Sequence, residues 1–433
     1  MPELSTDKSS KPHVKYLPFI PNGTVNIPPS KSDVHRAIIC AALSAGKCTI
    51  SPVALSNDIR ATIGVIEGLG GDVSINDDVL TVYGTNIFKT DNVTLDCGES
   101  GSALRFFIPV VAAGGISATF TGHGLLPQRP IGIFTEALPK AGVKCETKGG
   151  LPLKISGQLK SGTFEIPGNV SSQFITGLLL ALPLLDGDSD IVLTSPIESA
   201  GYINMTIYTM AQFGVEIEST DCGWHIKGNQ KYKSKDYKTD GDWSQAAFFM
   251  VSAAINGKIT VNGVKKDSAQ GDKMIAELLS QFGAKVSQTN TSVTVEKGNL
   301  TAISIDASQI PDLVPALSVC AAFAKGTTII YNAERLRIKE SDRLKTTASL
   351  INALGGKVKE LNDGLEIEGK ASLHGGFADG CNDHRIVMSA GVCAAGIDGE
   401  IECSYALSVN KSYPDFFIDY NNIGGKANVL DLR

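Results

Sequence analysis

The sequence predicts a two-domain α/β fold assembled from six repeated units, and three observations support this prediction. The first is a sequence marker, an apolar helix end followed by a glycine and an apolar strand, that recurs about every 70 residues. The second is another glycine between a helix and a strand, which recurs at the same interval. The third is the length of 433 residues, more than one hydrophobic core usually organises.

The two markers stay in phase along the chain. The first is centred on Gly71, Gly142, Gly214, Gly283, Gly356 and Gly425. The second is centred on Gly46, Gly115, Gly187, Gly257, Gly326 and Gly399. Glycine ends a helix readily because it adopts the left-handed conformation at little cost, and a strand then follows. Each unit is therefore expected to contain strands and two helices.

One helix of each unit is expected to be buried. The segments 244–255 and 312–324 are apolar on nearly every face, which is typical of a helix enclosed within a domain. This pattern disfavours an ordinary doubly wound sheet. Neither G-x-G-x-x-G nor G-x-x-x-x-G-K-[ST] occurs, so the sequence does not imply a dinucleotide or nucleoside triphosphate.

Composition argues against several classes of partner. The formal net charge of -6 disfavours nucleic acid, because binding to phosphate backbones draws on an excess of cations. The longest apolar run, 174–185, is shorter than the roughly 20 residues that span a bilayer, so no membrane segment is expected. Nine cysteines without a C-x-x-C pair, and a polar N-terminus without signal-peptide features, predict a cytoplasmic protein with reduced thiols. Six histidines without an H-E-x-x-H motif indicate no metal site. Cys97, beside a glycine-rich turn, fits either a nucleophile or, more readily, a packed thiol.

Three predicted helix starts carry groups suited to anions. The segment 28–36 places hydroxyls with Lys31 and Arg36 where free N–H groups and the helix dipole attract phosphate or carboxylate. An ordinary serine cap is the alternative. The segment 98–105 adds Gly101, which permits close approach to the backbone, and Arg105. The segment 168–173 adds two hydroxyls and an amide.

The most highly charged segment, 334–343, also indicates a ligand site. If it begins a helix, Lys339 and Arg343 share one face with Glu340 beside them. The alternative is a solvated helix start whose charges pair among themselves. The cations at element starts are Lys31, Arg36, Arg105, Arg129, Lys339, Arg343, Arg385 and Lys411. So many cations in an acidic chain predict small, multiply anionic substrates. Glu340 and Asp312 are candidates for proton transfer, although Asp312 also suits a helix cap.

These residues belong to motifs that resemble those of the EPSP synthase (3-phosphoshikimate 1-carboxyvinyltransferase) family. The matching segments are 29–36, 99–105, 128–131, 171–173, 199–202, 241–244, 310–312, 337–343, 382–385 and 411–415. The resemblance implies the inside-out α/β barrel of enolpyruvyl transferases, with three units in each of two domains. The expected domains are 1–21 with 242–433, and an inserted domain of 22–241, with the active site in the cleft between them.

The same resemblance implies the reaction. The enolpyruvyl group of phosphoenolpyruvate would move to the 5-hydroxyl of shikimate 3-phosphate, releasing phosphate through a tetrahedral adduct. No cofactor, metal or covalent enzyme intermediate is implied, and a monomer is expected. Asp312 would take the proton from the 5-hydroxyl, while Glu340 and Lys31 would serve proton transfer at the enolpyruvyl group.

The resemblance also assigns binding residues. Shikimate 3-phosphate would contact Lys31, Ser32, Arg36, Ser171, Ser172, Gln173, Ser199, Tyr202, Asp312 and Lys339. Phosphoenolpyruvate would contact Lys31, Gly101, Arg129, Gln173, Arg343, Arg385 and Lys411.

Some positions depart from the family pattern, and two other functions remain open at this point. Ser102 and Phe106 differ from many members, which leaves glyphosate sensitivity undetermined. Arg335 stands where some members have a substrate-contacting Asn, and it is assigned no role. The alternatives are the transferase acting on UDP-N-acetylglucosamine, whose usual Lys-Asn helix start and loop cysteine are missing here, and a non-catalytic anion-binding protein of the same fold. Glu340, Asp312 and Lys31 argue against the latter.

Overall fold

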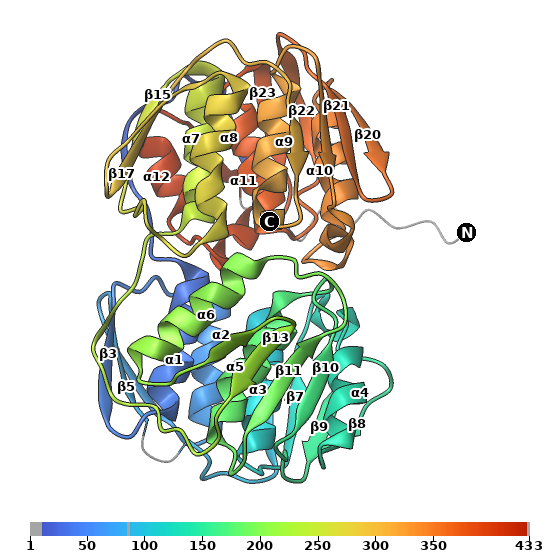
Figure 1. Ribbon diagram of the computed structural model, residues 1–433. Helices are drawn as coiled ribbons and strands as arrows, with labels where there is room; N and C mark the ends of the chain where they lie inside the picture. The colour runs from blue at the N-terminus through green and yellow to red at the C-terminus, as the bar shows by residue number, and fades with distance from the viewer. Residues whose placement is uncertain (1–10, 85–86, 431–433) are drawn as a thin grey trace. The chain divides into compact units, whose positions relative to one another are not determined.

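The protein structure is a computed structural model that describes residues 11–84 and 87–430 (Figure 1). The chain divides into two compact units, each with its own hydrophobic core. Unit 1 comprises Met1–Ile27, Trp243–Asp267 and Asp272–Arg433. Unit 2 comprises Pro28–Asp242 and the short segment Ser268–Gly271.

Unit 2 contains three four-stranded sheets, with the orders β14-β3-β5-β4, β6-β7-β9-β8 and β10-β11-β13-β12. The strands are β3 (Lys47–Ser51), β4 (Asp72–Asn76), β5 (Val79–Tyr83), β6 (Val93–Asp96), β7 (Ala118–Thr121), β8 (Lys144–Glu146), β9 (Leu153–Ser156), β10 (Thr163–Ile166), β11 (Ser189–Leu193), β12 (Glu218–Thr220), β13 (Gly223–Ile226) and β14 (Tyr237–Lys238). The helices are α1 (Lys31–Leu43), α2 (Asn57–Gly68), α3 (Gly101–Ala113), α4 (Gly132–Lys140), α5 (Ser172–Ala181) and α6 (Ala200–Gln212), with 3-10 turns η1 (Leu126–Gln128) and η2 (Leu182–Leu184).

Unit 1 repeats this arrangement, with the sheet orders β16-β17-β15-β2, β18-β19-β21-β20 and β22-β23-β1-β24. Its strands are β1 (His13–Tyr16), β2 (Asn22–Asn26), β15 (Lys258–Asn262), β16 (Lys285–Gln288), β17 (Ser292–Glu296), β18 (Ser304–Asp306), β19 (Thr327–Tyr331), β20 (Lys357–Leu361), β21 (Gly364–Glu368), β22 (Leu373–Ala378), β23 (Ile397–Cys403) and β24 (Ala427–Leu430). Its helices are α7 (Trp243–Asn256), α8 (Ile275–Phe282), α9 (Val314–Ala322), α10 (Arg343–Ala353), α11 (His384–Cys393) and α12 (Phe416–Asn422). The 3-10 turns are η3 (Gly271–Met274), η4 (Pro311–Leu313), η5 (Glu334–Ile338) and η6 (Ala406–Lys411).

Every sheet has the same design, a parallel pair of strands and an antiparallel pair, and the antiparallel pair is a hairpin in all sheets except the one that contains β1 and β24. In the second repeat, for example, β6 lies parallel to β7, and the hairpin β8–β9 pairs antiparallel with β7. A helix connects the two parallel strands, and a second helix leads to the hairpin. The α/β fold of six repeats expected from the glycine markers is therefore confirmed, with two helices in each repeat.

The first helix of each repeat is buried on all sides, as its composition predicts. All nine residues of α9 are buried, and in α7 every residue except Asn256 is buried. The same burial applies to most of α1, α3, α5 and α11. Sheets and outer helices therefore enclose apolar helices, which is the inside-out arrangement. Within the described residues, no helix is long and apolar enough to cross a membrane.

Strands exchanged between distant parts of the sequence set the unit boundaries. Strand β2 precedes α1 in the chain, yet it pairs in parallel with β15, as the blue segment beside yellow β15 in Figure 1 shows. Strand β14 precedes α7, yet it pairs in parallel with β3. The N-terminal β1 lies between β23 and β24 and completes the sixth sheet.

This exchange corrects the boundaries expected from the sequence. Residues 22–27 were assigned to the inserted domain, but the pairing of β2 with β15 places them in unit 1. The chain passes between the units after Ile27 and after Asp242. The chain also returns briefly from unit 1 to unit 2 at Ser268–Gly271, and the sequence analysis did not predict this segment.

Candidate functional site

The predicted site residues of unit 2 lie mainly at the starts of four helices. Lys31 begins α1, Gly101 begins α3 and Ser172 begins α5, while Ser199 directly precedes α6. The first N–H groups of a helix have no partner within the helix, and the dipole is positive there. These four starts therefore offer donors and positive potential to anions.

Lys31 combines a charge with a helix start. Its ammonium Nζ lies 2.6 Å from Asp58 Oδ2, and both side chains are largely buried. Its backbone N–H donates to Asp242 Oδ2 at 3.1 Å. Asp58, on α2, was not singled out from the sequence, because its role depends on the packing of α2 beside α1.

Arg36 is buried and held by neutral oxygens. Its Nε donates to Thr206 Oγ1 at 2.7 Å, and its Nη2 donates to the carbonyl of Tyr202 at 3.0 Å. Its Nη1 donates to the carbonyl of Ser32 at 2.6 Å. Burial lowers the pKa of Arg36 to about 10, a value at which it remains charged at neutral pH. Arg36 thus joins α1 to α6, and most of its N–H groups are hydrogen-bonded within the protein.

Arg105 fixes the orientation of Gln173. Its Nη1 donates to Gln173 Oε1 at 2.6 Å, and its Nη2 donates to the carbonyl of Pro130 at 2.9 Å. The amide Nε2 of Gln173 then donates to Ser102 Oγ at 3.0 Å. Because Oε1 accepts from a guanidinium, the assignment of the amide oxygen and nitrogen follows from the network.

Gly101 and Arg129 lie in contact. A Cβ atom added to Gly101 would lie only 2.7 Å from Arg129 Nη1 and 2.8 Å from its Cζ. The missing side chain therefore makes room for the Arg129 guanidinium, a reason that the sequence argument did not anticipate.

Ser199 has an unusual backbone conformation for a residue with a side chain. Its φ of 55° lies in the left-handed region, and the residue is buried. Such strain often accompanies functional positions. Tyr202, one turn into α6, places its ring 6.0 Å from the guanidinium of Arg36.

Unit 1 brings the predicted acids together around Arg343, which is almost fully buried. Arg343 Nη1 donates to Asp312 Oδ1 at 2.9 Å, and Nη2 donates to Glu340 Oε2 at 2.6 Å. Its Nε donates to Asp383 Oδ2 at 2.8 Å. These three carboxylates raise the pKa of Arg343 further, so the guanidinium stays charged. One arginine therefore organises both candidate proton-transfer groups.

The charged segment does not form one helix, contrary to the conditional expectation. Residues 334–338 form the 3-10 turn η5, Lys339 is extended, and α10 begins only at Arg343. The side chain of Asp342 caps α10 by accepting from the N–H of Lys345 at 3.1 Å. Lys339 and Arg343 nevertheless meet at Asp312 Oδ1, with Lys339 Nζ 3.8 Å away.

Arg385 and Lys411 complete the cluster of unit 1. Arg385 Nη2 lies 3.2 Å from Asp312 Oδ2, and its Nη1 donates to the carbonyl of Asp312 at 2.9 Å. Lys411 Nζ donates to the carbonyl of Asn382 at 2.6 Å. Burial alone would raise the pKa of Asp312, but Arg385, Lys339 and Arg343 together hold it well below its usual range. Burial lowers the pKa of Lys339 to about 8.

Two residues of this cluster had no role in the sequence analysis. Asp383, which is fully buried, accepts from both Arg343 and Ser341 and caps α11. Its position directly before an apolar helix was the available signal. Arg335 is buried, donates to the carbonyl of Ser308 and is one of the charges that lower the pKa of Lys339.

Cys97 is a buried thiol whose pKa is raised by burial, which favours the interpretation of a packed thiol over that of a nucleophile.

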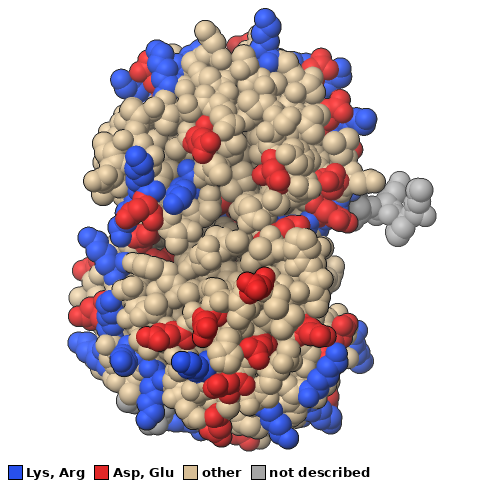
Figure 2. Space-filling view, in the orientation of Figure 1, with Lys and Arg blue, Asp and Glu red and all other residues tan. Residues whose placement is uncertain are grey.

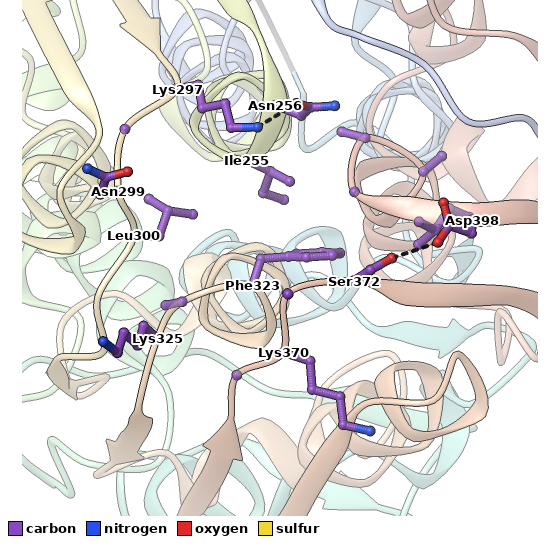
Figure 3. Close-up of a pocket in the computed structure, with 18 of the residues that line it drawn as sticks. Ile255, Asn256, Lys297, Asn299, Leu300, Phe323, Lys325, Lys370, Ser372 and Asp398 are labelled. Carbon is purple, nitrogen blue, oxygen red and sulfur yellow. Dashed lines mark hydrogen bonds between the residues drawn. The ribbon is translucent and has the colours of Figure 1, made fainter.

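A surface pocket of about 920 Å³ in unit 1 lies away from these residues (Figure 3). It is lined by segments that follow the C-terminal ends of α7, α9 and α11, including Asn256, Phe323 and Asp398. Figure 3 shows Lys297 donating to Asn256, and Ser372 to Asp398. None of the predicted site residues lines this pocket.

The predicted site cations differ from the basic residues on the surface. In the face shown in Figure 2, Lys and Arg lie interspersed with Asp and Glu. The guanidinium groups of the candidate site, by contrast, belong to buried residues. Among the described residues, no group of three or more His, Cys, Asp and Glu side chains is arranged to hold a metal ion.

Comparisons with known proteins show the family to which the chain belongs. Residues 21–419 match the family model of EPSP synthase (3-phosphoshikimate 1-carboxyvinyltransferase). The chain is 44% identical to 3-phosphoshikimate 1-carboxyvinyltransferase of Clostridium novyi, over 95% of this chain and 98% of the relative. A structure of EPSP synthase from Acinetobacter baumannii superposes with a TM-score of 0.82 at 25% identity, covering 97% of this chain and 100% of that one.

A further structure has a similar fold at low identity. The enolpyruvyl transferase NikO from Streptomyces tendae gives a TM-score of 0.79 at 16% identity, over 97% of this chain and 99% of that chain. The family-model match and the high identity with the Clostridium enzyme both extend over nearly the whole chain. The protein therefore belongs to the EPSP synthase family.

Proposed function

We propose that the charged residues of unit 1 and unit 2 act together on phosphoenolpyruvate and shikimate 3-phosphate. As a member of the EPSP synthase family, the protein is a transferase of the shikimate pathway, which leads to the aromatic amino acids. It moves the enolpyruvyl group of phosphoenolpyruvate to the 5-hydroxyl of shikimate 3-phosphate and releases phosphate. The observation that best supports the residue assignment is the cluster in which Arg343 holds Asp312 and Glu340.

Shikimate 3-phosphate is bound mainly by the helix starts of unit 2. Their hydroxyl, amide and cationic groups suit a ligand that carries a phosphate, a carboxylate and hydroxyls. The proposed contacts are Lys31, Ser32, Arg36, Ser171, Ser172, Gln173, Ser199 and Tyr202 from unit 2, with Asp312 and Lys339 from unit 1. Arg36 contributes few free donors, because most of its N–H groups already bond within the protein.

Phosphoenolpyruvate is bound by cations of both units. Guanidinium groups match phosphate and carboxylate with paired hydrogen bonds. The proposed contacts are Lys31, Gly101, Arg129 and Gln173 from unit 2, with Arg343, Arg385 and Lys411 from unit 1. Arg105 supports this set indirectly, because it orients the amide of Gln173.

The chemistry requires proton transfers in both steps: addition removes the proton of the 5-hydroxyl and adds one to the methylene carbon, and loss of phosphate removes a proton from that carbon again. Asp312 accepts the proton of the 5-hydroxyl as that oxygen attacks the enolpyruvyl carbon, and Glu340 and Lys31 exchange protons with the enolpyruvyl group and the bridging oxygen. Loss of phosphate from the tetrahedral adduct then gives the product. The adduct carries the negative charges of both substrates, which the surrounding cations stabilise.

The environment of Asp312 limits when it acts as a base. Its pKa is held well below the usual range by Arg385, Lys339 and Arg343 despite burial, so while these cations act on it Asp312 is a weak proton acceptor. Substrate anions that engage these cations weaken their hold on Asp312 and raise its pKa. Asp312 thus becomes a better base only when the substrates are bound.

The protein acts as a monomer in the cytoplasm. All proposed site residues come from one chain, so no second copy is needed to complete the site. The nine cysteines are all free, which fits a reducing compartment.

A direct assay tests the function. Phosphate release should require both phosphoenolpyruvate and shikimate 3-phosphate, and it should stop when either is omitted. UDP-N-acetylglucosamine offered in place of shikimate 3-phosphate should give no release. Release with that nucleotide sugar, or none with the proposed pair, would contradict the proposal.

A further inference from the structure

Asp33, in the first turn of α1, is a buried carboxylate with no assigned role. Asp33 lies three positions after Ser30, where in a capping box a Glu or Gln side chain returns to the N–H of the capping residue. Here the N–H of Ser30 donates instead to the carbonyl of Asp240, at 2.7 Å. The N–H of Asp240 donates to Asp33 Oδ2 at 3.1 Å. The backbone of Asp240, more than 200 residues away, thus lies between the two partners of the usual capping arrangement: its carbonyl accepts from Ser30, and its N–H donates to Asp33.

Asp240 belongs to a strap, residues 239–242, that lies across the start of α1. The N–H of Thr239 donates to the carbonyl of Ser51 at 3.0 Å, and the N–H of Asp242 donates to the carbonyl of Pro28 at 2.9 Å. Asp242 Oδ2 in turn accepts the N–H of Lys31. The strap is the last part of unit 2 before the chain passes into unit 1 at Trp243.

Tyr237 supplies the second strong donor to Asp33. Its hydroxyl donates to Asp33 Oδ1 at 2.8 Å, and both residues are buried. Thr209 lies 3.4 Å from the same oxygen, but its single proton is better placed on the carbonyl of Met205 at 2.9 Å. Asp33 therefore holds β14 with one oxygen and the strap with the other.

We propose that Asp33 is a positioning residue for shikimate 3-phosphate, because its carboxylate locks the strap onto the turn of α1 that presents Lys31 and Ser32. The inference rests on the proposed function, in which these two residues contact that substrate. Asp33 belongs to the same turn and is buried, so it acts through the position of Lys31 and Ser32.

The charge of Asp33 makes this role measurable. Burial raises its pKa to about 6, while the hydrogen bonds from Asp240 and Tyr237 and the charge of Arg36 favour the ionised form. The Asp240 carboxylate opposes ionisation. His35, on the same helix, is buried and its pKa is held well below its usual value, so it stays neutral across this range. A proton on Oδ2 weakens that oxygen as the acceptor of the Asp240 N–H, so the strap is held less firmly as the pH falls through about 6.

Asp33→Asn tests the proposal. An amide carries no charge and has one acceptor oxygen in place of two, so the charge-assisted hydrogen bonds to Tyr237 and Asp240 are weakened at every pH. We expect the KM for shikimate 3-phosphate to rise about tenfold at pH 7.5, the order expected for a lost hydrogen bond to a charged group, while kcat changes much less. The acidic decline of kcat/KM that arises from Asp33 should disappear in this variant.

Tyr237→Phe gives an independent test that keeps the carboxylate. Loss of the hydroxyl removes a bond that favours the ionised form, so the acidic decline should move to higher pH. The substrate phosphate also takes up a proton near pH 6, but it does so equally with every variant, so only differences between variants are informative. A purely structural role for Asp33 would not predict this shift.

Asp236→Asn is the matched control. Asp236 also ties this part of the chain to a neighbouring segment, because its carboxylate accepts from the N–H and hydroxyl of Thr49 in β3, but it is exposed and its partner lies outside α1. This variant should keep the KM and pH profile of the unmodified protein. If Asp33→Asn or Tyr237→Phe matches the unmodified profile, the positioning role is wrong. If the unmodified protein releases no phosphate, the proposed function has failed instead.

Discussion

Arg343 of unit 1 and Arg36 of unit 2 are held in opposite ways, whereas Lys31 of unit 2 pairs with a carboxylate, that of Asp58. In unit 1, Arg343 is surrounded by the carboxylates of Asp312, Glu340 and Asp383, and Arg385 also pairs with Asp312. In unit 2, Arg36 and Arg105 donate to hydroxyl, carbonyl and amide oxygens, and their guanidinium groups lie near aromatic rings.

This difference separates two tasks. A buried cation paired with carboxylates is neutralised, and the pair fixes the position and acidity of the acids. A buried cation held by neutral oxygens keeps its charge available to a nearby anion. Arg343 is therefore suited to fixing the proton-transfer candidates Asp312 and Glu340, and Arg36 is suited to holding an anionic group.

The largest effect is expected from Glu340→Gln. The amide preserves size but cannot exchange a proton, so kcat should fall by about 10² to 10⁴, the usual range for loss of a general acid or base. Shikimate 3-phosphate binding, measured by calorimetry, should change little. Glu360→Gln is the control, because Glu360 also pairs with an arginine, Arg337, but on the surface. Equal turnover in the two variants would remove Glu340 from the chemistry.

Arg343→Met tests the charge pairing of unit 1 directly. The substitution leaves three carboxylates without their shared partner, and Asp383 is fully buried. The free energy of unfolding should fall by about 3–5 kcal/mol, as when one partner of a buried ion pair is removed. Arg337→Met removes a more exposed arginine from two pairs and should cost less than about 1 kcal/mol. Urea denaturation measures both, and similar losses would mean that burial does not distinguish the pairs.

Gly101→Ala tests the fit of Arg129 in unit 2. The added Cβ would displace the guanidinium, so the KM for phosphoenolpyruvate should rise about tenfold and the KM for shikimate 3-phosphate much less. Gly64→Ala is the control, since a Cβ at Gly64 in α2 meets no atom within 4 Å. That variant should keep both KM values and gain roughly 0.5–1 kcal/mol of stability. A parallel rise in both KM values for Gly101→Ala would argue for general disruption of α3.

The smallest effect is a pH dependence from Lys339. Its pKa in the folded protein is about 8, below the usual 10.5, so it loses its proton first as the pH rises. Binding an anion then requires uptake of a proton, and affinity for shikimate 3-phosphate should fall by at most about tenfold per pH unit above 8.

Two variants check this assignment by calorimetry between pH 7 and 10. Lys339→Arg stays charged and should flatten the dependence. Arg335→Met removes a neighbouring charge that lowers the pKa of Lys339, so the decline should begin at higher pH. Unchanged curves for both variants would assign the dependence to another group.

The repeat, the buried helices and most candidate residues could be predicted from the sequence. Glycine spacing and apolar composition are local properties, and they identified 244–255 and 312–324 as enclosed helices, which correspond to most of α7 and to η4 with α9. The motifs that identified Lys31, Asp312 and Glu340 are also local, because each motif lies within a short segment of the chain. The sequence argument for Gly101 did not include its contact with Arg129, because that contact depends on folding.

Tertiary structure alone decided how these pieces combine. No local pattern shows that β2 pairs with β15 while β14 pairs with β3, because strand pairing depends on segments far apart in the chain. The same holds for Asp383 and Asp33, whose partners lie 40 and 207 residues away. Lys339 and Arg343 converge on Asp312 although they do not share a helix, since backbone turns rather than helical spacing bring them there. The sequence determined which groups the protein has, and long-range packing determined which of them meet.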